Sequence, residues 1–364
     1  MTVSRLEQDI KAQTESLGGV LQHQFGAGAS SIREAASLIR SCSKVLITGL
    51  GASMFAAIPL KYSLCARGID AVVIEAGELL HYLHEAYRDA LVMIVSRSGE
   101  SIEIAKLFTV LSPRQQIIGV SNEPASLLAK KADISLHIGS LPDEIVAIQT
   151  YMGSLLTLHI LGIAVDEGFA RSEGQIAGWF PELARLISRS LGSLQEWNSF
   201  LDCQSPVHLL ARGPSIASAM EGALLFNEIA KHPSIGMPIA SFRHGPVELV
   251  DQSFRGLVFA PSGRTRELNL ALAHDLKQFG GQVRVIGPML GDQMELDGVE
   301  FPNVQRHSHR CLKSSRCKRR HCAWHRSAES LQEAFALLHR WQPTRRVLGR
   351  SWVHCSSWLG HEQS

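Results

Sequence analysis

Residues 91–101 have the sequence LVMIVSRSGES, in which five apolar residues precede a short run of small polar ones. An unbroken apolar run predicts a strand buried on both faces, and the Ser- and Gly-rich segment after it predicts a turn into a helix. The same order recurs around it, at Val45–Thr48, Ala71–Ile74, Gln116–Val120 and Ile134–Ile138. Strands of this kind that alternate with helical segments indicate a parallel, doubly wound α/β sheet.

The second half of the chain repeats this organisation. Apolar runs at Val207–Ala211, Gly256–Ala260 and Val283–Gly287 are each followed by a loop, and long helical segments are predicted at Ile145–Val165 and Pro181–Phe200. We therefore expect two tandem α/β units with parallel sheets. The predicted divisions are N-terminal helices over 1–44, a first unit with trailing helices over 45–200, a second unit over 201–305 and a tail over 306–364.

Composition excludes several classes of protein. The chain has 364 residues, 45% of them hydrophobic and 19% charged, which is typical of folded globular proteins and excludes disorder. No apolar run approaches the ~20 residues of a membrane span, so we expect a cytoplasmic protein that does not contact membranes. Only three cysteines precede residue 306, which does not suggest a disulfide framework.

Two loops of the first unit are candidates for binding an anion. They contain Gly51, Ala52 and Ser53 after the first strand, and Ser96, Arg97, Ser98 and Ser101 after the third. Ligands of open parallel sheets bind beyond the carboxyl ends of the strands, where helix N-termini attract anions. The absence of a GxxxxGK pattern and of a spaced GxGxxG favours a compact phosphate over a nucleotide. The alternative is that both loops are ordinary turns with Ser caps.

The second unit offers groups that could move protons. Glu221 and Glu228 are seven residues apart on one predicted helix and hence on one face, and His244 follows in a loop with Gly245 and Pro246. A carboxylate and an imidazole suffice to transfer protons between adjacent sugar carbons. Taken singly, however, a helix glutamate is more often solvated and a lone histidine more often structural.

Together these segments resemble the sugar isomerase (SIS) domain family. SRSGES at 96–101 is similar to the family's phosphate loop, Gly51-Ala52-Ser53 to its first loop, and residues 221–246 to the isomerase half of the glucosamine-6-phosphate synthases. The resemblance covers roughly residues 5–305 and implies two flavodoxin-like SIS subdomains that bind phosphosugars as a homodimer or higher oligomer. It implies phosphate contacts from Ser53, Ser96, Ser98 and Ser101, proton transfer by Glu228, and ring opening by a His244 contributed by the neighbouring subunit.

Three departures limit what the resemblance implies. No glutaminase domain precedes the SIS-type helices, so we expect no glutamine-dependent transfer. Leu225 stands where the synthases have a lysine, and their lysine-bearing carboxyl-terminal tail is not recognisable. We expect an aldose–ketose isomerase or an amino-sugar-phosphate deaminase that needs no metal or organic cofactor, because the sugar carbonyl itself acidifies the adjacent C–H bond. The alternative is a phosphosugar sensor without catalytic activity, which Leu225 and the missing lysine favour.

Residues 306–364 differ in composition from the rest of the chain. They hold 12 of the 36 Lys and Arg residues, but only three of the 34 Asp and Glu. One interpretation is a zinc or nucleic-acid module built on Cys311, Cys317, Cys322 and His325, although the spacing matches no regular zinc motif and nucleic-acid binding is not expected. The favoured interpretation is an out-of-frame translation, which would leave the second sheet without its covering helix and impair activity. A divergent natural tail is the remaining alternative.

Overall fold

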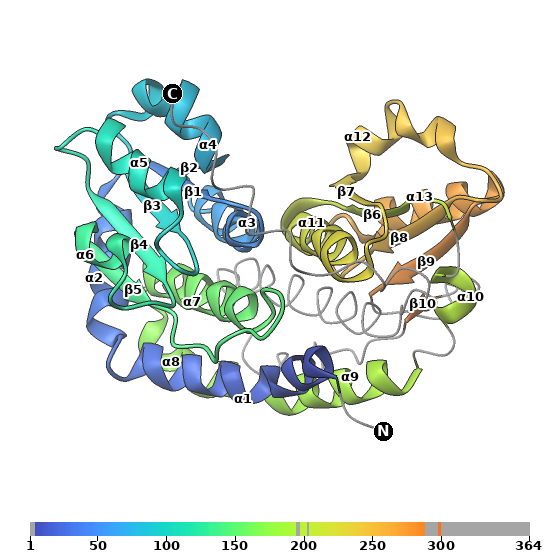
Figure 1. Cartoon of the computed structure of the whole chain (residues 1–364), viewed down its shortest axis with the longest axis horizontal. Coiled ribbons are helices and arrows are strands. Elements are labelled where there is room, and N and C mark those ends of the chain that lie inside the picture. Colours follow the sequence, from blue (N-terminus) through green and yellow to red (C-terminus); the bar gives the residue numbers. More distant parts are fainter. Residues whose placement is uncertain (1–3, 194–196, 202–203, 288–297, 300–364) are drawn as a thin grey trace, which may run out of the picture.

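The computed structural model describes residues 4–193, 197–201, 204–287 and 298–299, and it contains two five-stranded sheets whose strands all run parallel (Figure 1). The first sheet has the order β2-β1-β3-β4-β5 and comprises β1 (Lys44–Gly49), β2 (Asp70–Glu75), β3 (Leu91–Val95), β4 (Ile117–Ser121) and β5 (Ile134–His137). The second has the order β10-β9-β8-β6-β7 and comprises β6 (Val207–Ala211), β7 (Ser234–Pro238), β8 (Arg255–Phe259), β9 (Gln282–Ile286) and β10 (Gly298–Val299). The predicted fold class is confirmed.

The central strands are buried because their apolar runs are covered by helices on both faces. Every residue of β3, β4, β6 and β8 is buried, as expected for parallel strands inside a doubly wound sheet. In both sheets the first strand of the unit lies between the second and the third, since β1 pairs with β2 and β3, and β6 pairs with β7 and β8. The carboxyl ends of β1 and β3 are therefore neighbours.

Helices surround the first sheet and extend toward the second. They are α1 (Arg5–Phe25), α2 (Ala29–Ser41), α3 (Ala52–Cys65), α4 (Ala76–Glu78), α5 (Ile102–Val110), α6 (Leu127–Lys131), α7 (Gln149–Val165), α8 (Phe169–Ala177), α9 (Phe180–Ser193) and α10 (Asn198–Leu201), with a π-helical turn at Leu79–Leu83 and a 3-10 turn at His84–Tyr87. Helix α7 packs against α1, α2 and α3. It is apolar all round and almost entirely buried, which is typical of a central helix.

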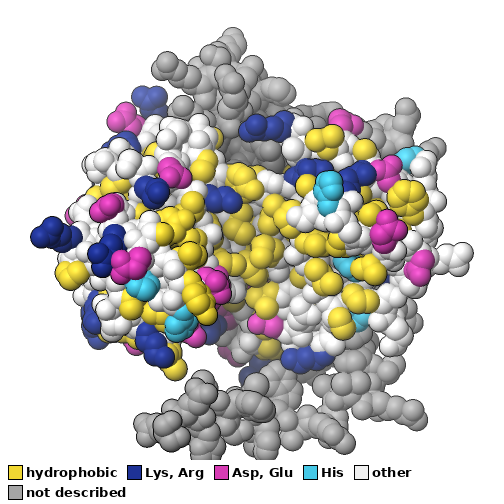
Figure 2. All heavy atoms as spheres, turned by 90° about the horizontal axis from the view of Figure 1, so that it is seen from above, with side chains coloured by type: hydrophobic (Ala, Val, Ile, Leu, Met, Phe, Trp, Pro, Cys, Tyr) yellow, Lys and Arg dark blue, Asp and Glu magenta, His cyan; other side chains and the backbone are white. Residues whose placement is uncertain are grey.

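The two sheets meet through α3 and α11 (Ile216–Leu225), which pack against each other. The remaining helical elements of the second unit are a 3-10 turn at Gly213–Ser215, a π-helical turn η5 (Phe226–Ala230), α12 (Ile239–Arg243), a 3-10 turn at Pro246–Leu249 and α13 (Arg266–Gln278). Seen from above, apolar side chains gather along the seam between the two halves (Figure 2). No helix in the described part of the chain is long and apolar enough to cross a membrane.

Several element boundaries differ from those predicted. Helix α7 begins at Gln149 rather than at Ile145, because Asp143 accepts hydrogen bonds from the first backbone N–H groups of the helix. The helix predicted over 181–200 is divided into α9 and α10. The helix expected to reach Ala230 is α-helical only to Leu225 and π-helical beyond it. Strand β7 was not predicted.

The basic tail over 306–364 lies outside the described residues. The predictions of an out-of-frame tail and of a zinc module at Cys311–His325 are therefore not tested by the structure.

Candidate functional site

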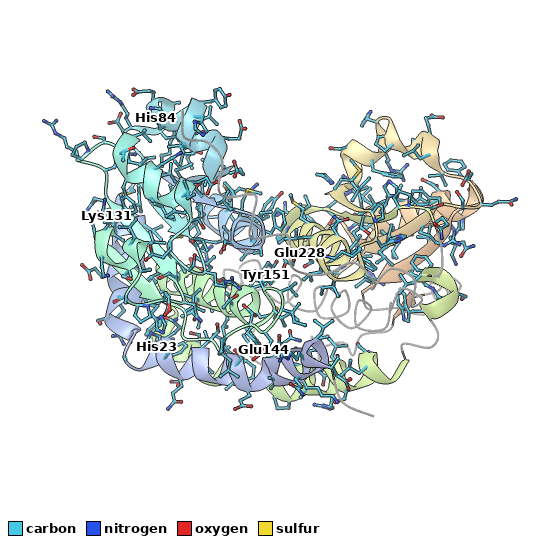
Figure 3. All side chains as sticks on the ribbon, in the orientation of Figure 1. His23, His84, Lys131, Glu144, Tyr151 and Glu228 are labelled. Atoms are coloured by element: carbon cyan, nitrogen blue, oxygen red, sulfur yellow. The ribbon has the colours of Figure 1, made fainter. Side chains whose placement is uncertain are left out.

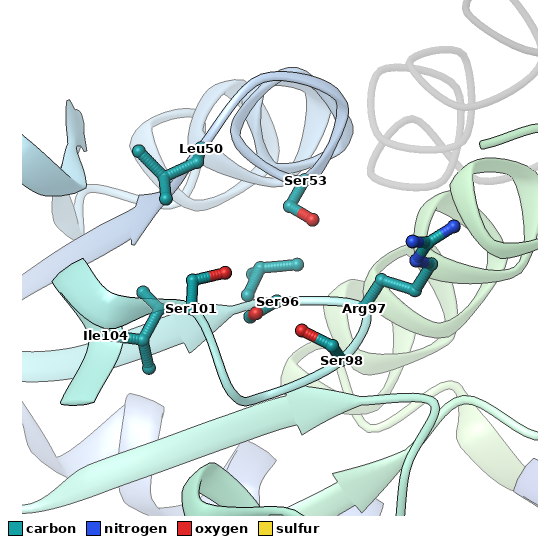
Figure 4. A pocket seen from close by; sticks show the side chains of 8 residues that line it. Leu50, Ser53, Ser96, Arg97, Ser98, Ser101 and Ile104 are labelled. Atoms are coloured by element: carbon teal, nitrogen blue, oxygen red, sulfur yellow. The ribbon is translucent and has the colours of Figure 1, made fainter. Parts of the chain in front are cut away.

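The loops that follow β1 and β3 enclose a pocket of about 140 Å³. At roughly 30 Å³ for a water molecule, this space is comparable to a small anion with part of a substituent. The hydroxyl groups of the pocket's four serines gather around this space, while Arg97 extends to one side (Figure 4). The lining residues are Leu50, Ser53, Val95, Ser96, Arg97, Ser98, Ser101 and Ile104. Sequence reasoning predicted all four serines and Arg97.

Two helices begin at this pocket without a side-chain cap. Helix α3 starts after Gly51, which has a φ of 49°, a left-handed conformation that favours glycine. Helix α5 starts after Ser101, whose hydroxyl does not cap it. No serine side chain caps either helix, so these loops are not the ordinary Ser-capped turns of the alternative. Uncapped N-termini direct partial positive charge and N–H donors at the pocket, an arrangement that suits an anion.

Hydrogen bonds within the second loop fix its shape. The Ser96 hydroxyl accepts from the N–H of Gly99 at 3.2 Å, and the Ser98 hydroxyl accepts from the N–H of Glu100 at 3.3 Å. The Glu100 carboxylate in turn accepts from the N–H of Leu127 at 2.6 Å, which ties the loop to α6. The hydroxyls of Ser53 and Ser101 make no hydrogen bond to the described part of the chain. These two hydroxyls are therefore available to a ligand.

Arg97 connects the pocket to the start of α7. Its Nη1 lies 3.7 Å from the Asp143 carboxylate, whose side chain is 1% exposed, whereas that of Arg97 is 54% exposed. Asp143 also accepts from the backbone N–H groups of Ile148 and Gln149 at 2.8 and 2.6 Å, and from the Thr150 hydroxyl. One buried carboxylate thus caps α7 and anchors the guanidinium beside the pocket.

The two glutamates predicted as a pair occupy different environments. Glu221 lies in α11 and is 1% exposed, while Glu228 lies in the π-helical turn η5 and is exposed. Burial raises the pKa of Glu221 well above its ordinary value, and repulsion by Glu228 and Asp143 raises it further. Partial desolvation also raises the pKa of Glu228, although Lys231 and Arg97 oppose this rise. The charge of Arg97 therefore acts both at the phosphate-sized pocket and on Glu228.

His244 does not join the serine loops in this chain. It is exposed at the end of α12, and no contact with Glu228 or the pocket is present in the described structure. That a neighbouring subunit supplies this histidine stays a prediction. No group of three or more His, Cys, Asp or Glu residues in the described ranges is arranged to hold a metal ion.

Sequence reasoning missed two polar residues near this site. Asp143 precedes the apolar run of α7 by a few residues, and an acidic residue before such a run is an N-cap signature that could have identified it. Tyr151 is buried in α7, and its hydroxyl has no hydrogen-bond partner in the described structure. Figure 3 shows Tyr151 and Glu228 at the seam between the two halves. No sequence signal distinguishes Tyr151 from an ordinary core aromatic.

Comparisons with known proteins find similarity to this chain in both sequence and structure. A family model described as the SIS domain matches residues 38–163 and 200–295. The glutamine–fructose-6-phosphate aminotransferase (isomerizing) of Pyrococcus horikoshii is 28% identical over 271 residues, which cover 72% of this chain and 45% of that protein. The chain thus aligns with about half the length of the curated relatives it matches.

Solved structures share the fold. The tagatose-6-phosphate ketose/aldose isomerase of Escherichia coli superposes with a TM-score of 0.71 at 18% identity, covering 92% of each chain. The glucosamine-6-phosphate deaminase of Thermotoga maritima superposes with a TM-score of 0.67 at 20% identity, again covering 92% of each. At these identities the likeness shows a common fold.

Proposed function

The chain belongs to the SIS domain family, and from that premise we propose that it is an enzyme that isomerises or deaminates a phosphorylated sugar by proton transfer. The observation that carries the proposal is the four-serine pocket at two uncapped helix N-termini, next to an arginine whose charge also acts on Glu228. The named activities of the similar proteins, isomerisation and deamination of hexose 6-phosphates, support this substrate class.

In the proposed mechanism the phosphate binds first and positions the sugar. The hydroxyls of Ser53 and Ser101, the helix N-termini and Arg97 hold the phosphate dianion. Fixing the phosphate removes much of the orientational cost of placing the reacting carbons near Glu228. The charge of Arg97 also opposes the rise in the pKa of Glu228. When Arg97 binds the phosphate, this effect on Glu228 weakens, and phosphate binding is thereby coupled to proton transfer.

Glu228 then acts as the base and acid. As a carboxylate it takes the proton from the carbon next to the carbonyl, which gives an enediolate, and it returns that proton to the former carbonyl carbon while the hydroxyl proton moves from one sugar oxygen to the other. For a deaminase, the same rearrangement of an amino sugar is followed by loss of ammonia as water adds. Partial desolvation raises the pKa of Glu228 toward neutral pH. A group with a pKa near the working pH both accepts and donates a proton effectively. His244 of a second subunit completes the proposed site by assisting ring opening in a homo-oligomer.

The proposal is tested by turnover of hexose 6-phosphates and their amino derivatives. Glu228→Gln should abolish turnover while the protein still binds the phosphate, because the amide cannot accept the proton. Glu173→Gln, which changes an exposed glutamate on α8, is the matched control and should retain the wild-type rate. A folded Glu228→Gln protein that turns over at the wild-type rate would remove Glu228 from the mechanism.

A second candidate function is a phosphosugar sensor without turnover. Leu225 stands in the sequence between Glu221 and Glu228, where the family resemblance implies a lysine. Its side chain is fully buried. An apolar, enclosed residue there deprives the site of a charge but leaves the serine pocket intact. Calorimetric binding of a hexose 6-phosphate, with no product from any hexose 6-phosphate or amino derivative, would favour the sensor.

A further inference from the structure

Glu221 is a buried carboxyl group that the described chain does not satisfy. Its side chain is 1% exposed, and neither Oε1 nor Oε2 has a hydrogen-bond partner. Buried carboxyl groups in proteins are almost always paired or hydrogen-bonded, because an isolated charge loses its hydration without compensation. Both carboxyl oxygens of Glu221 are therefore open to a group from outside the chain.

The neighbours of Glu221 define what that group must be. Glu228 from the turn after α11 and Asp143 from the loop before α7 act on it with like charge, and both raise its pKa. Tyr151 of α7 interacts with it electrostatically, and the Tyr151 hydroxyl is itself buried without a partner. One turn further along α11, Leu225 is completely buried and apolar. These described neighbours supply acceptors and negative charge.

Arg97, the cation that borders the phosphate pocket, is already engaged. Arg97 forms its ion pair with Asp143 and acts on Glu228, and it borders the phosphate pocket. It is not among the groups that affect Glu221. A phosphate bound by Arg97 would leave the excess of carboxyl groups around Glu221 uncompensated.

We propose that Glu221 is a specificity-determining residue that, together with the Tyr151 hydroxyl, binds the protonated amino group of an amino-sugar phosphate. An ammonium carries three N–H donors and one positive charge, which complement two carboxylate oxygens and a phenolic oxygen. Leu225 makes this possible, because a lysine at that position would occupy the carboxylate from within the chain. Glu221 and Tyr151 are buried and do not line the serine pocket, so the amine reaches them only after a local rearrangement of their side chains.

This inference rests on the proposed function, and a comparison of two probes separates them. Glucosamine 6-phosphate and glucose 6-phosphate share the phosphate and the ring and differ in the amine. Calorimetry below the amine's pKa should show that the wild-type protein binds glucosamine 6-phosphate at least about tenfold more tightly. Burial raises the pKa of Glu221 in the free protein, and a bound ammonium favours the ionised form of this carboxyl. Glu221→Gln keeps the shape but cannot ionise, and the ratio of the two affinities should fall to about one.

Two further variants keep the test decisive. Tyr151→Phe removes only the hydroxyl and should reduce the ratio without abolishing it. Leu225→Lys places an ammonium one turn from Glu221 and should also remove the preference for the amine, whereas the apolar control Leu225→Met should retain it. Equal wild-type affinity for the two probes, or an unchanged ratio in Glu221→Gln, would overturn the role of Glu221 and leave the phosphosugar proposal standing. Failure of the wild-type protein to bind either probe would overturn both.

Discussion

Replacement of Gly99 by alanine should damage both stability and phosphate binding, because the residue stands where the serine loop presses on α6. Gly99 has a φ of 65°, and a Cβ atom there would lie 2.7 Å from the Cβ of Ser126 and closer still to its hydroxyl oxygen. Ser126 cannot withdraw freely, since its hydroxyl caps α6 by accepting from the N–H of Ala129 at 3.2 Å.

The magnitude follows from these two effects. A non-glycine residue in the left-handed region costs about 1–2 kcal/mol, and overpacking or loss of the Ser126 cap adds roughly 1–2 kcal/mol. We expect Gly99→Ala to lower the free energy of unfolding by about 2–4 kcal/mol. If the loop instead relaxes to relieve the clash, the Ser96 and Ser98 hydroxyls move and affinity for a hexose 6-phosphate falls.

Urea unfolding and calorimetric binding of fructose 6-phosphate measure the two effects separately. Gly18→Ala is the matched control, because Gly18 lies inside α1 with nothing within 4 Å of an added Cβ. That variant should gain roughly 0.5–1 kcal/mol, since alanine favours a helix interior over glycine. A Gly99→Ala protein with wild-type stability and wild-type affinity would refute the packing argument.

Three further predictions concern the pocket and the buried carboxylates. Ser53→Ala and Ser101→Ala should each weaken calorimetric binding of a hexose 6-phosphate by roughly 2–10-fold, from a net hydrogen-bond contribution of about 0.5–1.5 kcal/mol; unchanged affinity in both would place the phosphate elsewhere. Asp143→Ala should lower the free energy of unfolding in urea by about 1–2 kcal/mol through loss of the α7 cap, and Asp143→Asn, which retains an acceptor oxygen, should lose less; equal losses would argue against capping. In the folded chain the pKa of Glu221 is well above its ordinary value of 4.5, whereas in the unfolded chain it is near that value. The unfolded chain therefore loses this proton first, and the stability of the fold decreases as pH rises above about 4.5. Glu221→Gln should therefore gain stability relative to wild type as pH rises above about 4.5, and a difference that does not change with pH would contradict the buried, neutral carboxyl.

The sequence allowed the sheets and the serine loops to be predicted because their signals are local. The apolar runs of β1 and β3 are continuous, and each ends at glycine or small polar residues that mark the carboxyl edge of a strand. Strand β7 lacks this signal, since Ser234–Pro238 has the sequence SIGMP, with a glycine in its middle and a proline at its end. It becomes a strand by pairing with β6, a tertiary effect that no local pattern records.

The chemistry of the carboxylates could be predicted only in part. The spacing predicted Glu221 and Glu228 on one face of one helix, whereas the structure buries Glu221 in α11 and leaves Glu228 exposed in the π-helical turn that follows. Their contrasting exposure follows from the packing of α11 against α3 and from the π-helical turn after Leu225, which depend on residues far away in the sequence. The ion pair between Arg97 and Asp143 likewise joins two loops that only the folded sheet brings together.

Exchange of solvent deuterium into the sugar tests the central claim most directly, because it detects proton transfer at carbon even where the net reaction is slow. The wild-type protein is incubated in D2O with fructose 6-phosphate or glucosamine 6-phosphate, and label at the first two carbons is followed by NMR. We expect exchange catalysed by the wild-type and Glu173→Gln proteins and none by Glu228→Gln. Binding of both sugars without any exchange, or equal exchange by Glu228→Gln, would contradict it.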